Sequence, residues 1–243
     1  MIRIRNLHKS LNGQAVLQGI DLEIHDGETL AILGKSGSGK TVLLKHIVGL
    51  LKPDRGSIWV DDREVPKLRR SELFRLRRKF GYVFQASALF DSLTVYENLA
   101  LALRDRGYPE TEIEEKIHQI LELMGLQGNE EKYPSELSGG MQKRVSVARA
   151  LITDPKYLLY DEPTAGLDPV TAETINDLML SLKSRFRVTA VLVTHDLRCA
   201  LRVADRIALL SGGKIRIVVP AEETLKIKDP ELQEFFRSLE FRA

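Results

Sequence analysis

Residues 34 to 41, with the sequence GKSGSGKT, carry the clearest chemistry in this chain. They follow the apolar run TLAIL and precede VLLKHIVGLL, which has the composition of a helix. In such a strand-loop-helix unit, glycines let the backbone curl until several N–H groups face a phosphate, and the helix N-terminus adds a favourable dipole. The lysine is expected to reach the β- and γ-phosphates of a nucleotide, and the threonine to bind Mg²⁺. The predicted phosphate-binding residues are Gly34, Lys35, Ser36, Gly37, Ser38, Gly39, Lys40 and Thr41.

A pair of acids ends a second apolar run, KYLLYDE. A buried strand would carry Asp161 and Glu162 to its C-terminal end, where the sites of parallel sheets lie. Asp161 suits the magnesium shell, and Glu162 suits a general base or a carboxylate that orients water. The pair favours hydrolysis of a nucleotide by water, and an acidic pair that only caps a strand is the alternative.

The segment ELSGGMQKRVSVARAL contains a second candidate anion site. Ser138, Gly139 and Gly140 stand at the start of a predicted helix, whose N-terminal N–H groups attract a phosphate. One nucleotide needs only one such loop. We therefore expect the Ser138 loop to bind the γ-phosphate held by another copy of the chain, in a head-to-tail homodimer with two shared sites. On these residues alone, an ordinary serine N-cap is an equal alternative.

The elements that would position these residues form an α/β pattern. Alternation in MIRIRNL and IDLEI predicts half-buried strands, whereas TLAIL, YLLY and TAVLVTH are typical of strands buried on both faces. Between residues 92 and 151 helical signals dominate, with Ile113, Ile117, Ile120, Leu121 and Met124 on one face. We expect a parallel core with an antiparallel β flank from residues 1–91 and 152–220, an inserted helical subdomain at 92–151, and a helical tail at 221–243.

Composition narrows the possible partners. The 36 Lys and Arg residues nearly balance the 34 Asp and Glu residues, so the chain lacks the basic field of an electrostatic nucleic-acid binder. A single cysteine, Cys199, excludes an internal disulfide, and the N-terminus lacks a signal-peptide pattern. No apolar run approaches the roughly 20 residues that span a bilayer. The expectation is a globular, cytoplasmic chain. We expect the basic segment 67–79 to be a solvated helix face, with a binding patch for an acidic lipid or partner as the alternative.

The order of motifs along the chain resembles the ATP-binding cassette (ABC) ATPase family over nearly its whole length. GKSGSGKT, VFQ, LSGGM, YLLYDEP, AGLD and TH match the family's Walker A, Q-loop, signature, Walker B, D-loop and H-switch. The resemblance implies a P-loop NTPase (RecA-like) core, a single ABC ATPase domain over residues 1–243, and hydrolysis of ATP with Mg²⁺. By the same resemblance, Gln85 joins the magnesium and water shell, Asp168 bridges two subunits, and His195 contacts the γ-phosphate.

One departure concerns the nucleotide base. Family members usually stack an aromatic side chain on adenine in the loop before the second strand, and the matching position here is Leu11. Without stacking, we expect weaker discrimination between ATP and GTP than is usual. The signature also contains Met141 where glutamine is commoner, which should not affect phosphate binding because Ser138 and the backbone provide it.

The segment FQASALFDSLTVYENLA resembles a narrower group, the Mla and Mkl type of ATPase that serves MCE-protein transporters of phospholipids or other hydrophobic compounds. That resemblance implies a peripheral subunit at the cytoplasmic face of the inner membrane. Its partners would be an MlaE-like permease, an MCE-domain protein and a small STAS-like regulatory subunit, and these partners would handle the phospholipid. Ala88, Leu89, Phe90 and Leu93 form an apolar patch beside Gln85 that suits docking to the permease.

Other classes explain fewer of the motifs. A generic ABC importer or exporter subunit remains an alternative for the substrate. A P-loop kinase or GTPase would account for GKSGSGKT but not for LSGGM, and the chain has no NKxD motif. A soluble ABC ATPase of DNA repair or translation would keep all the motifs, but such proteins usually carry coiled-coil insertions or two cassettes.

Overall fold

The central sheet of the computed structural model, which describes residues 1–228, 233 and 236, has six strands in the order β10-β9-β3-β8-β7-β6. The five strands from β9 to β6 are parallel, and β10 pairs antiparallel with β9. Every residue of β3, β7 and β8 is buried, as their uninterrupted apolar sequences predicted. The strands are β3 (Thr29–Leu33), β6 (Phe80–Val83), β7 (Tyr157–Asp161), β8 (Thr189–Thr194), β9 (Arg206–Ser211) and β10 (Lys214–Pro220).

A second, antiparallel sheet of four strands has the order β2-β1-β4-β5. Its strands are β1 (Ile2–Leu11), β2 (Gln14–Ile24), β4 (Arg55–Val60) and β5 (Arg63–Glu64). The turn from β1 to β2 places Asn12 and Gly13 at φ 51° and 79°, the left-handed conformation that a tight hairpin needs. Buried side chains of this sheet pack with those of α1 (Lys40–Ile47) and one face of the central sheet.

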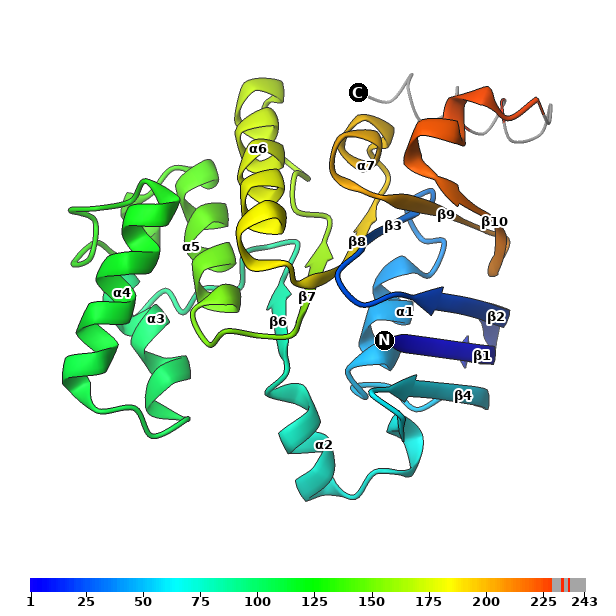
Figure 1. Cartoon of the computed structure of the whole chain (residues 1–243), viewed down its shortest axis with the longest axis horizontal. Coiled ribbons are helices and arrows are strands. Elements are labelled where there is room, and N and C mark those ends of the chain that lie inside the picture. The colour runs from blue at the N-terminus through cyan, green and yellow to red at the C-terminus, as the bar shows by residue number, and fades with distance from the viewer. Residues whose placement is uncertain (229–232, 234–235, 237–243) are drawn as a thin grey trace.

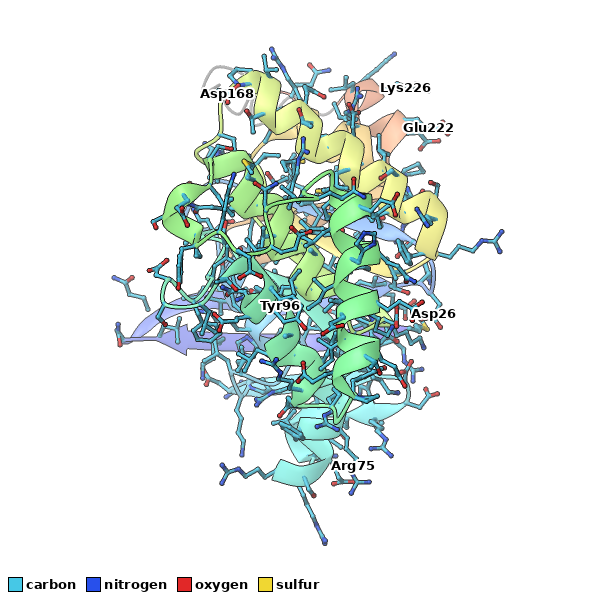
Figure 2. All side chains as sticks on the ribbon, turned by 90° about the vertical axis from the view of Figure 1, so that its left-hand side faces the viewer. Asp26, Arg75, Tyr96, Asp168, Glu222 and Lys226 are labelled. Carbon is cyan, nitrogen blue, oxygen red and sulfur yellow. The ribbon has the colours of Figure 1, made fainter. Side chains whose placement is uncertain are left out.

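Apart from α2 (Arg70–Arg77), whose buried Leu76 packs in the same cluster as α1, the remaining helices cover the other face of the central sheet or extend beyond β6. α6 (Pro169–Phe186) and α7 (Leu197–Val203) lie over the central strands, while α3 (Val95–Arg104), α4 (Glu110–Met124) and α5 (Gly139–Leu151) form the lobe at the left of Figure 1. α2 (Arg70–Arg77) lies below β6 in the same view. Figure 2 faces the helical lobe and places Asp168 at one end of the molecule and Arg75 of α2 at the other.

The helical lobe forms because its sequence signals agree with its packing. Thr94 caps α3, accepting from the backbone N–H of Glu97 at 3.2 Å, while the Glu97 carboxylate accepts from the backbone N–H of Thr94 at 2.8 Å. α4 buries the five apolar residues that the helical spacing predicted and ends at Gly125, whose φ is 64°. This mixed architecture confirms the predicted fold class: an α/β P-loop core with an antiparallel β flank and an inserted helical region.

Several sequence expectations can be placed on this fold. Cys199 is buried on α7, as a small core residue would be. Of the predicted helical tail at 221–243, residues 221–226 form a 3-10 helix, and the residues after 228, apart from 233 and 236, lie outside the described residues. The division of the chain at residues 91, 151 and 220 stays a prediction. Within the described part of the chain, no helix is both long enough and apolar enough to cross a membrane.

Candidate active site

The loop GKSGSGKT joins the C-terminal end of β3 to the start of α1. The backbone N–H of Gly34 donates to the carbonyl of Thr194 in the neighbouring strand β8 at 3.2 Å. Gly37 and Gly39 have φ of 79° and 101°, and a Cβ at Gly34 would lie 2.6 Å from the Leu210 carbonyl oxygen. The tight curl therefore requires glycine at these positions, since a side chain would strain the backbone or collide with it.

Lys40, the first residue of α1, folds back across this loop. Its Nζ donates to the carbonyls of Gly34 at 2.8 Å and Lys35 at 3.1 Å, and lies 3.0 Å from Glu162 Oε1. The side chains of Lys40 and Glu162 are 6% and 9% exposed. Because the ammonium is buried and surrounded by oxygen acceptors, it can transfer to phosphate oxygens without first losing a water shell.

Thr41 and Asp161 meet across the sheet edge. Thr41 Oγ1 donates to Asp161 Oδ1 at 2.8 Å, and Tyr82 of β6 donates its hydroxyl to Asp161 Oδ2 at 3.0 Å. Burial raises the pKa of Tyr82, and the negative charge of Asp161 raises it further, so the phenol stays a donor. The sequence did not single out Tyr82. The only available signal was its position in FGYVF, a strand expected to lie in the sheet.

These oxygens fit the magnesium ion that the sequence predicts. Adjacent corners of an octahedron with Mg–O distances near 2.05 Å are about 2.9 Å apart, close to the separation of Thr41 Oγ1 and Asp161 Oδ1. Hydroxyl and carboxylate oxygens are the donors that Mg²⁺ takes in nucleotide sites. In addition, Ser38 Oγ is buried within the loop without a hydrogen-bond partner among the described residues, as expected of a group that awaits a phosphate.

Glu162 begins the loop after β7 and binds His195, which follows β8. Glu162 has φ of 49°, an unusual conformation for a residue with a side chain, and its N–H donates to the Val193 carbonyl at 2.9 Å. Glu162 Oε2 accepts from the backbone N–H of His195 at 3.2 Å and lies 2.9 Å from its Nδ1. A carboxylate here favours the Nδ1–H tautomer, which leaves Nε2 free. The imidazole is 42% exposed and can meet a ligand.

Gln85 follows β6, and the structure places it differently from the residues above. Its side chain is exposed, and no hydrogen bond among the described residues joins it to Thr41 or Asp161. Instead, its main-chain carbonyl accepts a hydrogen bond from Lys143 of α5. The sequence did not identify Lys143. The predicted contact of Gln85 with the magnesium shell stays a prediction.

The remaining predicted residues lie together but apart from the loop of Lys40. Ser138 caps α5 by accepting from the N–H of Met141 at 3.3 Å, and Asp168 caps α6 by accepting from the N–H groups of Val170 and Thr171 at 3.0 Å. Hydrogen bonds from Thr171 hold the pKa of Asp168 below its usual value. A Cβ at Gly140 would lie 2.5 Å from Thr171 Cγ2, so the two loops are neighbours. Among the described residues, no hydrogen bond or ion pair links Ser138 or Asp168 to Lys40.

Comparison with known proteins identifies, along most of the chain, the same family that the order of motifs resembles. The sequence profile of the ABC transporter family matches residues 17–165. The methionine import ATP-binding protein MetN of Carboxydothermus hydrogenoformans is 42% identical over 218 residues, which are 88% of this chain and 65% of that protein. The probable ribonucleotide transport ATP-binding protein mkl of Mycobacterium leprae is 38% identical over 235 residues, 96% of this chain and 68% of the relative. The chain thus spans about two thirds of the length of these relatives.

Solved structures agree in fold. The ATP-binding cassette MJ0796, a dimer bound to ADP and Pi in a post-hydrolysis state, superposes with a TM-score of 0.83 at 33% identity, covering 91% of this chain and 99% of that one. CbiO1 from Clostridium perfringens, part of the ABC transporter complex cbiONQ, has a TM-score of 0.86 at 30% identity, covering 100% of this chain and 95% of that one. With its phosphate loop, acidic pair and helical lobe in the arrangement described above, this chain belongs to the ABC transporter family of ATP-binding proteins.

Proposed function

We propose that the chain is the ATP-hydrolysing subunit of an ABC transporter that moves phospholipid through a separate permease. The observation that carries the ATPase assignment is the convergence of four side chains at one edge of the central sheet, where Lys40 contacts Glu162 at 3.0 Å and Thr41 contacts Asp161 at 2.8 Å. Nucleotide hydrolysis requires these groups: a cation for the phosphates, oxygen ligands for Mg²⁺ and a carboxylate that acts on the attacking water.

Each residue has a distinct role in this proposal. Lys40 binds the β- and γ-phosphates, Thr41 and Asp161 would hold Mg²⁺, and Gln85 completes the shell of metal and water. Bound there, Mg²⁺ supplies positive charge that neutralises the phosphate oxygens. Glu162 accepts the proton of the attacking water or orients it, while His195 holds Glu162 through Nδ1 and turns Nε2 toward the γ-phosphate.

The contact between Lys40 and Glu162 suggests an order of events. In this structure Glu162 Oε1 lies 3.0 Å from Lys40 Nζ, so that oxygen is engaged. When phosphates draw the ammonium away, Oε1 becomes available to a water molecule while Oε2 stays bound to His195. Both oxygens of Glu162 are therefore engaged without nucleotide, and Glu162 would become free to act as a base only when nucleotide is bound.

The second anion loop calls for a partner copy. We infer that Ser138, Gly139 and Gly140 bind the γ-phosphate held by the other subunit of a homodimer, and that Asp168 lies in the same interface. To raise the closed fraction of the dimer from 1% to 99%, ATP must bind the closed form more tightly than the open form by about 5.5 kcal/mol. Sedimentation of the Glu162→Gln variant with ATP tests this inference. A stable dimer is expected, and a variant that stays monomeric with ATP would count against shared sites.

A groove beside Gln85 suits the permease. It has a volume of about 690 Å³ and lies between α2, β6 and α3. Exposed apolar side chains line it: Phe74, Phe84, Phe90 and Leu101. Apolar groups gathered in this way on a surface mark protein contacts. Docking of a permease segment here would place the chain at the cytoplasmic face of the inner membrane as a peripheral subunit.

The sequence of residues 84–100 and the names of the relatives both bear on the substrate. The resemblance of residues 84–100 to the Mla and Mkl type supports phospholipid, with an MCE-domain protein and a small STAS-like subunit as further partners. The relatives' names point elsewhere, one to methionine import and the other to ribonucleotide transport. The identity of 42% to MetN makes methionine import the second candidate.

Purification from detergent-solubilised host membranes, followed by mass spectrometry of the proteins and lipids that accompany the chain, separates these candidates. A permease with an MCE protein and bound phospholipid is the expected result. A permease of another class would overturn the lipid assignment and keep the ATPase. The recovery of no membrane protein, together with ATPase activity stimulated by DNA or ribosomes, would overturn the transport assignment.

A further inference from the structure

Lys143 is a buried cation whose role the motifs do not explain. It lies on the inner side of α5, 4% exposed, and its Nζ donates to the main-chain carbonyl of Gln85. Lysine is almost never fully buried, because its ammonium loses strong hydration on leaving water. Because burying the ammonium is costly, its hydrogen bond to the Gln85 carbonyl suggests that this contact has a specific role.

A second cation of the same helix holds the same loop. Arg149 donates to the carbonyls of Ala88 at 2.7 Å and Ser87 at 3.1 Å. Ser87 and Ala88 have φ of 58° and 50°, a region that residues with side chains seldom occupy. The main chain after β6 is thus held in a strained path by hydrogen bonds from α5 to three carbonyls.

The helix α5, which makes these contacts, reaches three regions of the proposed site. The helix begins at the Ser138 loop, beside the start of α6, and ends against β6, where a Cβ on Gly81 would lie 2.2 Å from the Ala150 carbonyl oxygen. Arg149 and Ala150 also line the groove proposed for the permease. One rigid helix therefore connects the second anion loop, the loop of Gln85 and the groove.

The charge of Lys143 also acts near the acidic pair. Burial lowers the pKa of Lys143, and the negative charges of Asp161 and Glu162 oppose that shift. The ammonium is therefore within electrostatic reach of both carboxylates while hydrogen-bonded to Gln85. Arg144, one residue further along the helix, differs: it donates to the Met124 carbonyl at the end of α4, at 3.2 Å, and has no contact with the loop of Gln85 among the described residues.

We propose that Lys143 is a positioning residue for ATP hydrolysis, which holds the main chain of Gln85 so that the Gln85 side chain moves with α5 and the Ser138 loop. This inference rests on the proposed function, because it assumes that Gln85 takes part in hydrolysis. When α5 moves, the carbonyl contact carries Gln85 toward or away from Thr41 and Asp161. Removing the contact should slow turnover but leave nucleotide binding by Lys40 intact.

The test is a double-mutant cycle on ATP hydrolysis by the purified full chain. Lys143→Met should lower kcat about tenfold while KM for ATP changes less than about twofold, since misplacement of a group by about 1 Å can cost up to a hundredfold in rate. In a Gln85→Ala background the same substitution should cost less than about twofold, because the group that it positions is already gone. Arg144→Met, which removes a comparable contact from the same helix, should leave kcat unchanged.

The outcomes separate this inference from the proposed function. An equal loss from Lys143→Met with and without the Gln85 side chain would overturn the positioning role and leave the ATPase assignment standing. A Gln85→Ala variant with unchanged kcat would overturn the role of Gln85 and this inference with it. Thermal unfolding of every variant checks the fold. If Lys143→Met fails to fold, Lys143→Gln, which keeps an N–H donor, should retain more activity than Lys143→Ala, and equal activities would overturn the inference.

Discussion

Replacing Glu162 by glutamine should strengthen the binding of ADP while it abolishes most hydrolysis. In this structure the Glu162 carboxylate holds Lys40, with Oε1 and Nζ 3.0 Å apart in surroundings that leave 9% and 6% of the two side chains exposed. The lysine of such a loop binds the β-phosphate of a nucleotide. Nucleotide and Glu162 therefore compete for one ammonium, and the variant removes the charged competitor.

The expected magnitude follows from the geometry. Two unit charges 3.0 Å apart interact by about 5 to 6 kcal/mol at an effective dielectric constant near 20. Most of this gross attraction is offset because the carboxylate is desolvated, and because the glutamine oxygen and the carbonyls of Gly34 and Lys35 still accept from Lys40. A net gain of about 1 to 2 kcal/mol remains, which corresponds to ADP binding about 5 to 30 times tighter. Loss of the proposed base should lower kcat by about 10² to 10⁴.

Isothermal titration calorimetry with ADP measures this effect cleanly, because ADP has no γ-phosphate to hydrolyse or to hold two subunits together. Glu28→Gln is a matched control: its carboxylate is 11% exposed and pairs with Arg206 at 3.0 Å, away from the loop of Lys40. The control should bind ADP as the unmodified chain does. Unchanged or weaker ADP binding by Glu162→Gln would refute the idea that nucleotide displaces Glu162 from Lys40.

Three further predictions concern stability and base selection. Burial raises the pKa of Asp61, but hydrogen bonds from two lysines and a tyrosine hydroxyl outweigh burial and hold that pKa well below its usual range. The stability that Asp61 contributes is therefore present above about pH 4 and is lost as the pH falls toward the folded-state pKa. Asp61→Asn should accordingly flatten the decline of Tm between about pH 5 and 2. Gly81→Ala places a Cβ 2.2 Å from the Ala150 carbonyl oxygen and should cost about 1 to 3 kcal/mol in urea unfolding, whereas a loss below about 0.5 kcal/mol would show that α5 can shift. With Leu11 at the hairpin end, kcat/KM for ATP and GTP should be comparable, and Leu11→Tyr should raise the preference for ATP about two- to tenfold through stacking; a large ATP preference of the unmodified chain would show that another group recognises adenine.

Much of the site followed from sequence alone because parallel strands end at a common edge. The phosphate loop that leads to Lys40 and the pair Asp161 and Glu162 each follow an apolar run, and such runs could be assigned to a buried sheet without knowing their order. The buried face of α4 was likewise predictable, since helical spacing specifies which residues share a face. Local patterns were sufficient where the periodicity of one segment determines which element it forms and which side chains that element buries.

Only the tertiary structure could reveal which side chains contact one another across segments distant in sequence. Tyr82 reaches Asp161, and Lys143 reaches the carbonyl of Gln85, because β6 lies beside β7 and α5 packs against β6. Nothing in FGYVF or LSGGMQKRV indicates these partners, since both segments could pack in other ways with the same local pattern. The contacts depend on strand order, on the close approach that Gly81 permits, and on side-chain directions set by the packed core, which are properties of the whole chain rather than of any one segment.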